Sequence, residues 1–443
     1  MYQRGLHSYL PATHWIADLQ ATAAFRPATI WIRESVLPRI FAALKLAQTA
    51  VGGAISAFWT FPSILASAFL VAWAAEAAQF MISQGLALAI LAWLQTLPEF
   101  AVEAVIAWEA GKDPAVTHLA IANFTGAIRL LLGLGWPMIY FVAALSSVVN
   151  RRRRVWAEIH LDDEHAIEVM GLVPPLLWFF WIWHKGSISL VDAAVLTAMY
   201  GAYLFVLWRV PPKDEGGVED VGHVPRAVLR LSTRLRWSAI ISLFAAGGAL
   251  LYFTAHPFLE SMLALAVFFG VSDFVFVQWV APFLSEFPEK VSAFYWARKV
   301  STAPMALMNM VSSNINQWTV LAAMIPIVYS LSVGEPTALQ FDGAQRDEIL
   351  ITILQSVLGV LILSNMRFAF WEAALLFVLW FAQFLRAELR DTISWVYGIW
   401  AVMLIVDSFA DRTRWRAPRL FWRLLHSPPQ PQPGPEEEPR SLI

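Results

Sequence analysis

The residues best suited to chemistry in this sequence are glutamates that directly follow a proline inside apolar runs. Pro98-Glu99 and Pro288-Glu289 both lie in such runs, 190 residues apart. Proline lacks a backbone N–H and breaks a helix, which frees a carbonyl oxygen close to the carboxylate. A hard cation needs several oxygens in one place. The pattern therefore predicts a cation site at two helix breaks.

Each Pro-Glu pair is accompanied by further polar residues at helical spacing. Glu103 lies four residues after Glu99, and Glu286 lies three before Glu289, so each pair of carboxylates shares a helix face. Ionisable groups within a bilayer are costly and usually mark an ion or proton path. The helix after the second pair carries amides and a hydroxyl on one face: Asn309, Ser313 and Gln317.

Composition indicates that the bilayer surrounds these glutamates. Of 443 residues, 58% are apolar and 14% are charged, against about 25% charged in an average soluble domain. The apolar runs are continuous over about 20 residues, which favours membrane-spanning helices over β-barrel strands. A net charge of −2 excludes a nucleic-acid binder driven by bulk charge, and the absence of Cys excludes disulfides and thiolate chemistry.

The apolar runs predict about eleven helices. The expected spans are 62–83, 86–108, 115–147, 168–184, 188–208, 238–268, 273–297, 303–333, 349–365, 368–386 and 392–408. An extra helix near 40–60 either crosses the membrane or lies along its surface. Lys and Arg, including the run 151–154, crowd the loops after odd-numbered spans, which the positive-inside rule places in the cytoplasm together with the C-terminus.

Comparison of the chain with itself indicates two inverted repeats. The first Pro-Glu pair falls in the second span and the second in the seventh, and Asn123 and Asn314 also match. A weaker match relates Asp192 to Glu372. An odd number of spans between two copies forces them into opposite orientations, which is the plan of many secondary transporters.

These motifs resemble those of the calcium/cation antiporter superfamily, which includes the sodium/calcium exchangers. Residues 94–99 and 284–289 are similar to the first family motif, G-T/S-S-L-P-E. Residues 308–317 are similar to the second, G-N-x-x-G-S-N-x-x-N/D, and 117–126 are its degraded counterpart. The resemblance covers residues 62–386.

The resemblance implies an all-α polytopic membrane protein with about ten core transmembrane helices in two inverted five-helix repeats, plus extra terminal helices. It implies cations bound at the membrane centre, with Glu99 and Glu289 as the metal ligands. The full set of residues that it places at the cation site, with Glu286 added, is Thr96, Glu99, Asn123, Ser285, Glu286, Glu289, Ser313, Asn314 and Gln317.

Departures from the family motifs bear on the coupling ion. Ala122 and Gly126 replace neutral ligands in the first copy, while Glu286 replaces a sodium-liganding Ser. Glu103 and Arg129 are further candidates for coupling. Fewer neutral oxygens and more carboxylates favour proton coupling over sodium coupling, and Arg129 is expected to add a positive charge near the site.

The sequence therefore predicts a secondary antiporter that exchanges a divalent cation, calcium, for protons or sodium by alternating access. Transported inorganic cations and the bilayer are its expected partners, with no cofactor, no nucleic acid and no enzymatic activity. The expected location is a prokaryotic inner membrane. The alternative is a transport-inactive scaffold or sensor derived from the same fold.

The predicted domain plan follows the spans. It comprises an N-terminal extension (1–60), a first repeat (61–209), a cytoplasmic loop (210–237), a second repeat (238–388), an extra helix with a basic segment (389–425) and a disordered tail (426–443).

The topology can be checked by labelling single cysteines, because the parent chain has none. A membrane-impermeant maleimide should reach Arg153→Cys and Arg226→Cys only from the cytoplasm. It should reach Lys112→Cys and Gln340→Cys only from outside. Labelling of Gln340→Cys from the cytoplasmic side alone would overturn the topology.

Overall fold

The computed structural model describes residues 56–113, 117–149, 158–210, 222–268 and 281–426. The predictions for most of the N-terminal extension, for the arginine run at 151–154 and for the tail from residue 427 lie outside these residues. The described part is helical throughout, apart from four two-residue strands.

The helices follow the predicted spans closely. Those of the first half are α4 (Ala57–Ala78), α5 (Gln84–Gln95), α6 (Leu97–Lys112), α7 (Thr117–Leu130), α8 (Trp136–Val149), α9 (Ala166–Gly171), α10 (Val173–Lys185) and α11 (Leu190–Arg209). The rest are α12 (His223–Leu229), α13 (Thr233–Phe268), α15 (Ala281–Ser285), α16 (Phe287–Ala297), α17 (Ala303–Asn316), α18 (Ala322–Val333), α19 (Gly343–Leu363), α20 (Phe370–Leu385), α21 (Arg390–Ala410) and α22 (Arg416–His426).

Several of these helices have the length and character of membrane spans. Within the described ranges, seven are long and apolar enough to cross a bilayer, or eight if the bent pair α5–α6 is counted as one span. The apolar helix α20 is shorter than this test requires. The predicted loop 210–237 is partly helical, because it contains α12 and the start of α13.

The second helix of the first half is broken where the sequence predicts it. α5 and α6 meet at Thr96 with a bend of 44°. Pro98 occupies the first turn of α6, where its missing N–H costs nothing. The related break in the second half lies at Glu286, between α15 and α16, with Pro288 in the first turn of α16.

The third helix of each half is irregular at its middle. A π-helical turn, η3 (Leu131–Gly135), joins α7 to α8, and another, η7 (Gln317–Leu321), joins α17 to α18. Such turns are rare and are found mostly at functional sites. Both follow the segments 117–126 and 308–317, in which the sequence predicts ligands.

Two pairs of short strands join the halves. β1 (Ile159–His160) pairs antiparallel with β4 (Arg367–Phe368), and β2 (Ser187–Ile188) pairs with β3 (Leu339–Gln340). In each pair one strand comes from each half. The pairing therefore puts 187–188 and 339–340 on one face, as the charge bias predicts for the loops after even-numbered spans.

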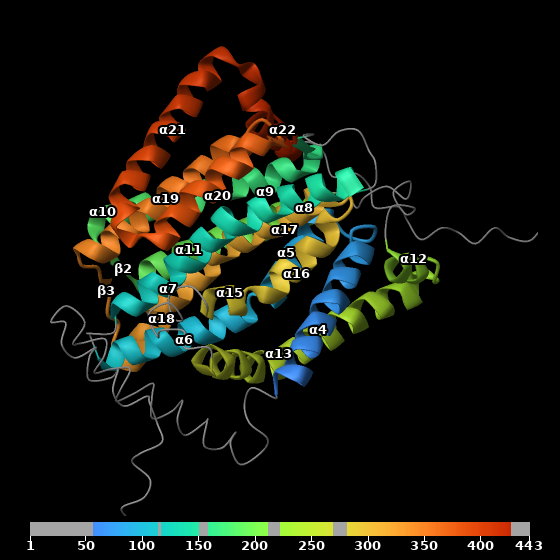
Figure 1. Cartoon of the computed structure of the whole chain (residues 1–443), viewed down its shortest axis with the longest axis horizontal. Coiled ribbons are helices and arrows are strands. Elements are labelled where there is room, and N and C mark those ends of the chain that lie inside the picture. Colours follow the sequence, from blue (N-terminus) through green and yellow to red (C-terminus); the bar gives the residue numbers. More distant parts are fainter. Residues whose placement is uncertain (1–55, 114–116, 150–157, 211–221, 269–280, 427–443) are drawn as a thin grey trace, which may run out of the picture.

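The two halves interlock at the broken helices. α5 packs against α17 and α6 against α18, while α15 and α16 pack against α7 and α8. In Figure 1 these helices form the middle of the molecule, with α4 and α13 side by side at one edge and α21 and α22 at another. The middle of the fold is thus built from both repeats.

The strand pairing can be tested by engineered cross-links. Ser187 and Gln340 are directly opposite each other in β2 and β3. Ser187→Cys/Gln340→Cys should form a disulfide under mild oxidation, visible as a mobility shift that a reductant reverses. His160→Cys/Gln340→Cys is the matched control, because these residues lie in different strand pairs. Cross-linking of the control alone would contradict the pairing.

Candidate cation site

The two repeat-related glutamates lie in the first turns of the helices that follow the breaks. Glu99 is in the first turn of α6 and Glu289 in the first turn of α16, and both are completely buried. A carboxylate is stabilised at a helix N-terminus by the backbone dipoles. The sequence positions both groups through the proline that starts each helix.

The first carboxylate is held by residues of both repeats. Asn123 of α7 donates from Nδ2 to Glu99 Oε1 at 3.0 Å and to Glu103 Oε2 at 2.9 Å. Ser285, at the end of α15, donates its hydroxyl to Glu99 Oε2. Four predicted site residues are therefore in one connected group.

The second carboxylate is held by the helix after it. Ser313 Oγ of α17 donates to Glu289 Oε1 at 3.0 Å. Gln317 Nε2, at the start of η7, donates to Glu286 Oε1 at 3.0 Å. Ser313 and Gln317 contact the two glutamates because they lie one helical turn apart on one face.

Lys290 is a charged member of the site that sequence reasoning missed. Its Nζ donates to Glu286 Oε2 at 2.6 Å, and its side chain is only 5% exposed. The signal was present in the sequence, because Lys290 lies four residues after Glu286, the spacing at which side chains on a helix surface meet. Both oxygens of Glu286 are thus occupied, one by Lys290 and one by Gln317.

Thr96 joins a second polar network that crosses between the halves. Its hydroxyl accepts from Asn316 Nδ2 at 2.6 Å. The preceding residue, Gln95, donates to Ser292 Oγ at 2.6 Å and lies 3.5 Å from Asn309 Nδ2. Asn316, Gln95 and Ser292 were not predicted. Amides repeated through an apolar helix would have been the signal for them.

Several buried oxygens at the site have no hydrogen-bond partner among the described residues. They are Glu103 Oε1, Glu289 Oε2, Asn309 Oδ1, Asn314 Oδ1, Asn316 Oδ1 and Gln317 Oε1. Buried polar atoms in folded proteins are nearly always paired with protein, water or an ion. Half of these atoms belong to predicted ligands, and all of them are acceptors, the type of atom that binds a hard cation.

The carboxylates alone do not enclose an ion in this arrangement. No group of three or more Asp, Glu or His side chains in the described ranges is placed to hold a metal. An ion between Glu99 and Glu289 would therefore need neutral oxygens from α7 and α17 as well. Asn123 of α7 and Ser313 and Asn314 of α17 carry neutral side-chain oxygens of this type.

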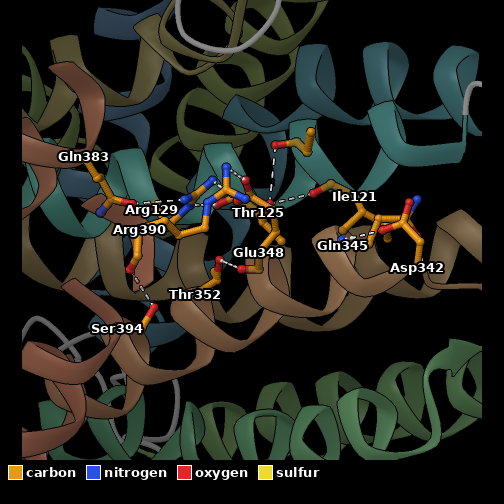
Figure 2. Close-up of polar contacts among 11 residues, drawn as sticks. Ile121, Thr125, Arg129, Asp342, Gln345, Glu348, Thr352, Gln383, Arg390 and Ser394 are labelled. Atoms are coloured by element: carbon orange, nitrogen blue, oxygen red, sulfur yellow. Dashed lines mark hydrogen bonds and ion pairs between the residues drawn. The ribbon is translucent and has the colours of Figure 1, made fainter. Parts of the chain in front are cut away.

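Arg129 does not lie with the site glutamates, which corrects the expectation that it adds a positive charge near them. It forms an ion pair with Glu348 of α19, and Glu348 Oε1 also contacts Arg390 of α21 at 2.5 Å (Figure 2). Arg129 Nη1 donates to Gln383 Oε1 at 3.0 Å. This second cluster of buried charge attaches α21 to the core.

A family comparison identifies the class of protein. The family model described as sodium/calcium exchanger protein matches residues 51–209 and 239–387, most of the chain. The chain belongs to this family, a family of transporters, and the predicted resemblance is confirmed. The protein is an integral membrane protein of this class.

Two solved structures illustrate the likeness. The crystal structure of the H⁺/Ca²⁺ exchanger CAX is 32% identical, covering 91% of this chain and 98% of its own, with a TM-score of 0.70. The sodium-calcium exchanger NCX_Mj is 18% identical over 75% of this chain and 98% of its own, with a TM-score of 0.54, and shows the fold alone. A search of curated proteins found no match.

The ion pair of Lys290 and Glu286 can be tested by a double-mutant cycle. Breaking a buried pair from one side costs about 3 to 5 kcal/mol, because it leaves one uncompensated charge, whereas removing both partners costs much less. Lys290→Met and Glu286→Gln should each lower the melting temperature in detergent, and the double variant should recover most of the loss. Additive losses would show that the two groups are not coupled.

Proposed function

We propose that the protein exchanges calcium for protons across a prokaryotic inner membrane by alternating access, with its C-terminus in the cytoplasm. Membership of the sodium/calcium exchanger family supports cation antiport. Similarity to the H⁺/Ca²⁺ exchanger CAX, at 32% identity over nearly the whole chain, supports this pair of ions.

One observation carries the proposal: the first glutamate is held by residues of both repeats. Glu99 accepts from Asn123 of its own half and from Ser285 of the other half. A site at the junction of two bodies changes shape when they move relative to each other. Alternating access requires a site of this kind, at the interface of inverted repeats.

The charge balance at the site favours competition between calcium and protons. Lys290 compensates Glu286, which leaves Glu99, Glu103 and Glu289 without a basic partner among the described ion pairs. Carboxylates in a low-dielectric interior must be neutralised by a bound cation or by protons. A calcium ion and protons therefore compete for the same groups, which is the minimum requirement for exchange.

The same balance makes Glu286 a poor sodium ligand. Both of its oxygens already accept hydrogen bonds, from Lys290 and Gln317. Sodium would have to displace one of these donors before it could bind there. This argument supports protons rather than sodium as the coupling ion.

Reconstituted proteoliposomes provide the direct test. Uptake of calcium, manganese, sodium and potassium would be measured separately, each with and without a pH gradient. Calcium uptake driven by the pH gradient is expected. If no ion moves but calcium still raises the melting temperature, the protein is a binding-competent scaffold or sensor. If the melting temperature is also unchanged, the proposed site is wrong.

The two central glutamates should be equally indispensable. Glu99→Gln and Glu289→Gln should each abolish calcium exchange, because an amide cannot replace a charged ligand at low dielectric. Flux assays on folded, reconstituted variants check this. Calcium exchange at the wild-type rate in both variants would show that the cation site lies elsewhere.

Neutral ligands should matter more in the second repeat than in the first. Asn314→Ala removes an amide whose side-chain atoms have no other described partner. Losing one neutral ligand at about 1 to 1.5 kcal/mol corresponds to about tenfold weaker apparent calcium affinity. Ala122→Gly is the control in the first repeat, at the position that matches Ser313, and it should change the affinity by less than about twofold. Equal losses would contradict the proposed asymmetry.

A further inference from the structure

The two repeats share a second set of matched residues, away from the cation site. With a shift of 180 positions, β1 corresponds to β3 and β2 to β4. The same shift relates Glu168 of α9 to Glu348 of α19, and His165 to Gln345. Each half therefore buries one glutamate in the first part of its fourth membrane-crossing segment.

The glutamate of the second half is compensated by permanent charges. Glu348 contacts Arg129 and Arg390, and Figure 2 shows both guanidinium groups beside its carboxylate. Arginine does not lose its proton in proteins. The carboxylate of Glu348 therefore faces two fixed positive charges.

The glutamate of the first half has a titratable partner instead. Glu168 Oε1 lies 3.4 Å from Nδ1 of His165, and both side chains are almost completely buried. Gly85, in the first turn of α5, permits this position, because a Cβ there would lie 2.4 Å from Glu168 Oε1. No arginine or lysine forms an ion pair with Glu168 in the described part of the chain.

α22, which packs against α9, brings the charged and titratable groups Arg416, Arg419, Arg423 and His426 to this region. Asp162 and Glu164, next to His165 in the chain, act on it electrostatically. Asp163 is bound by Arg416 of α22, at 2.9 Å. Tyr203 of α11 is the titratable neighbour of Glu168 on that helix. The sequences of α5 and α17 contain no ionisable side chain, and α10 and α19 contain none in their nearer halves.

Two atoms of the pair have no hydrogen-bond partner among the residues that the structure describes. They are Glu168 Oε2 and His165 Nε2. A neutral imidazole and a carboxylate together carry one negative charge. The pair becomes electrically neutral when it binds one proton, whichever of the two groups holds it. Removing that proton leaves an uncompensated negative charge. Binding one proton therefore removes the free-energy cost of an uncompensated buried charge at this pair.

Tyr203 of α11 contacts both α9, which carries Glu168, and α17, which carries Ser313. The ring of Tyr203 lies against the end of α9, where a Cβ on Gly171 would come within 3.0 Å of it. The Tyr203 hydroxyl is 3.3 Å from Ser312 Oγ. The next residue, Ser313, donates to Glu289.

We propose that His165 and Glu168 form a proton-binding site, separate from the cation-binding carboxylates, that is loaded from the side of the membrane on which α22 lies. α22 packs against α9 and the preceding turn η4 (Asp163–His165), which fixes the side. The proton is held between the imidazole and the carboxyl group. The role of this site in transport rests on the proposed exchange of calcium for protons.

The test varies pH on one side of the membrane at a time. Inverted and right-side-out vesicles from expressing cells would be used to follow calcium flux in wild type, Glu168→Gln and His165→Gln. The His165→Gln variant reproduces the matched Gln345. His160→Gln is the control, because His160 is exposed on the same face, five residues away.

One proton that limits transport makes the rate change up to about tenfold per pH unit on the α22 side. In Glu168→Gln and His165→Gln this dependence should fall below about twofold, while the dependence on the opposite side and the behaviour of His160→Gln stay as in wild type. The proposal is overturned if the calcium flux of both variants depends on the pH of the α22 side as in wild type. It is also overturned if the pH dependence weakens equally on both sides of the membrane, or if neither variant folds.

A second measurement separates this site from the proposed function. If wild-type vesicles move no calcium, the proposed exchange is wrong. The proton site is then tested by measuring the melting temperature in detergent between about pH 6 and pH 8. The change in melting temperature with pH should then be smaller in His165→Gln than in His160→Gln. Equal changes would exclude proton binding at this pair.

Discussion

The structure depends on one constraint, the cost of keeping carboxylates inside an apolar bundle. Glu99, Glu103, Glu286 and Glu289 are all buried where water cannot solvate them. Each must find hydrogen-bond donors, a fixed positive charge, a bound cation or a proton. The breaks in the helices, the amides of α7 and α17 and the ammonium group of Lys290 all meet this requirement. The acceptors without a partner among the described residues are the ones that the proposed transport of a cation would use.

The same constraint is met differently in the two halves, and this asymmetry gives the protein its particular chemistry. At the matched positions outside the cation site, Glu348 is compensated by two arginines, whereas Glu168 faces a histidine. Within the site, Lys290 compensates Glu286, and the matched position of the first half is Phe100. Inverted repeats with identical charges would bind ions symmetrically. In the proposed exchange of calcium for protons, unequal compensation would make the two sides of the membrane differ in their response to protons.

The extra C-terminal helices are attached to the core by charge as well as by apolar packing. Arg390 at the start of α21 reaches Glu348, and Arg416 at the start of α22 reaches Asp163. The family match ends at residue 387, before either arginine. These helices therefore contact both matched acidic segments of the fourth membrane-crossing elements, although they lie outside the repeats themselves.

The sequence by itself determined the helical membrane fold, the inverted repeats and the two Pro-Glu breaks, because hydropathy and proline act locally along the chain. It also indicated Asn123, Ser313 and Gln317, since helical spacing fixes which side chains share a face. Tertiary structure alone decided which groups compensate one another. Arg129 and Glu348 are far apart in the chain, as are Ser285 and Glu99, and their meeting depends on how the two halves pack. The four-residue spacing between Glu286 and Lys290 could have predicted their contact from the sequence. Only the burial of both side chains in the structure shows that the pair is desolvated and that its charges must compensate each other.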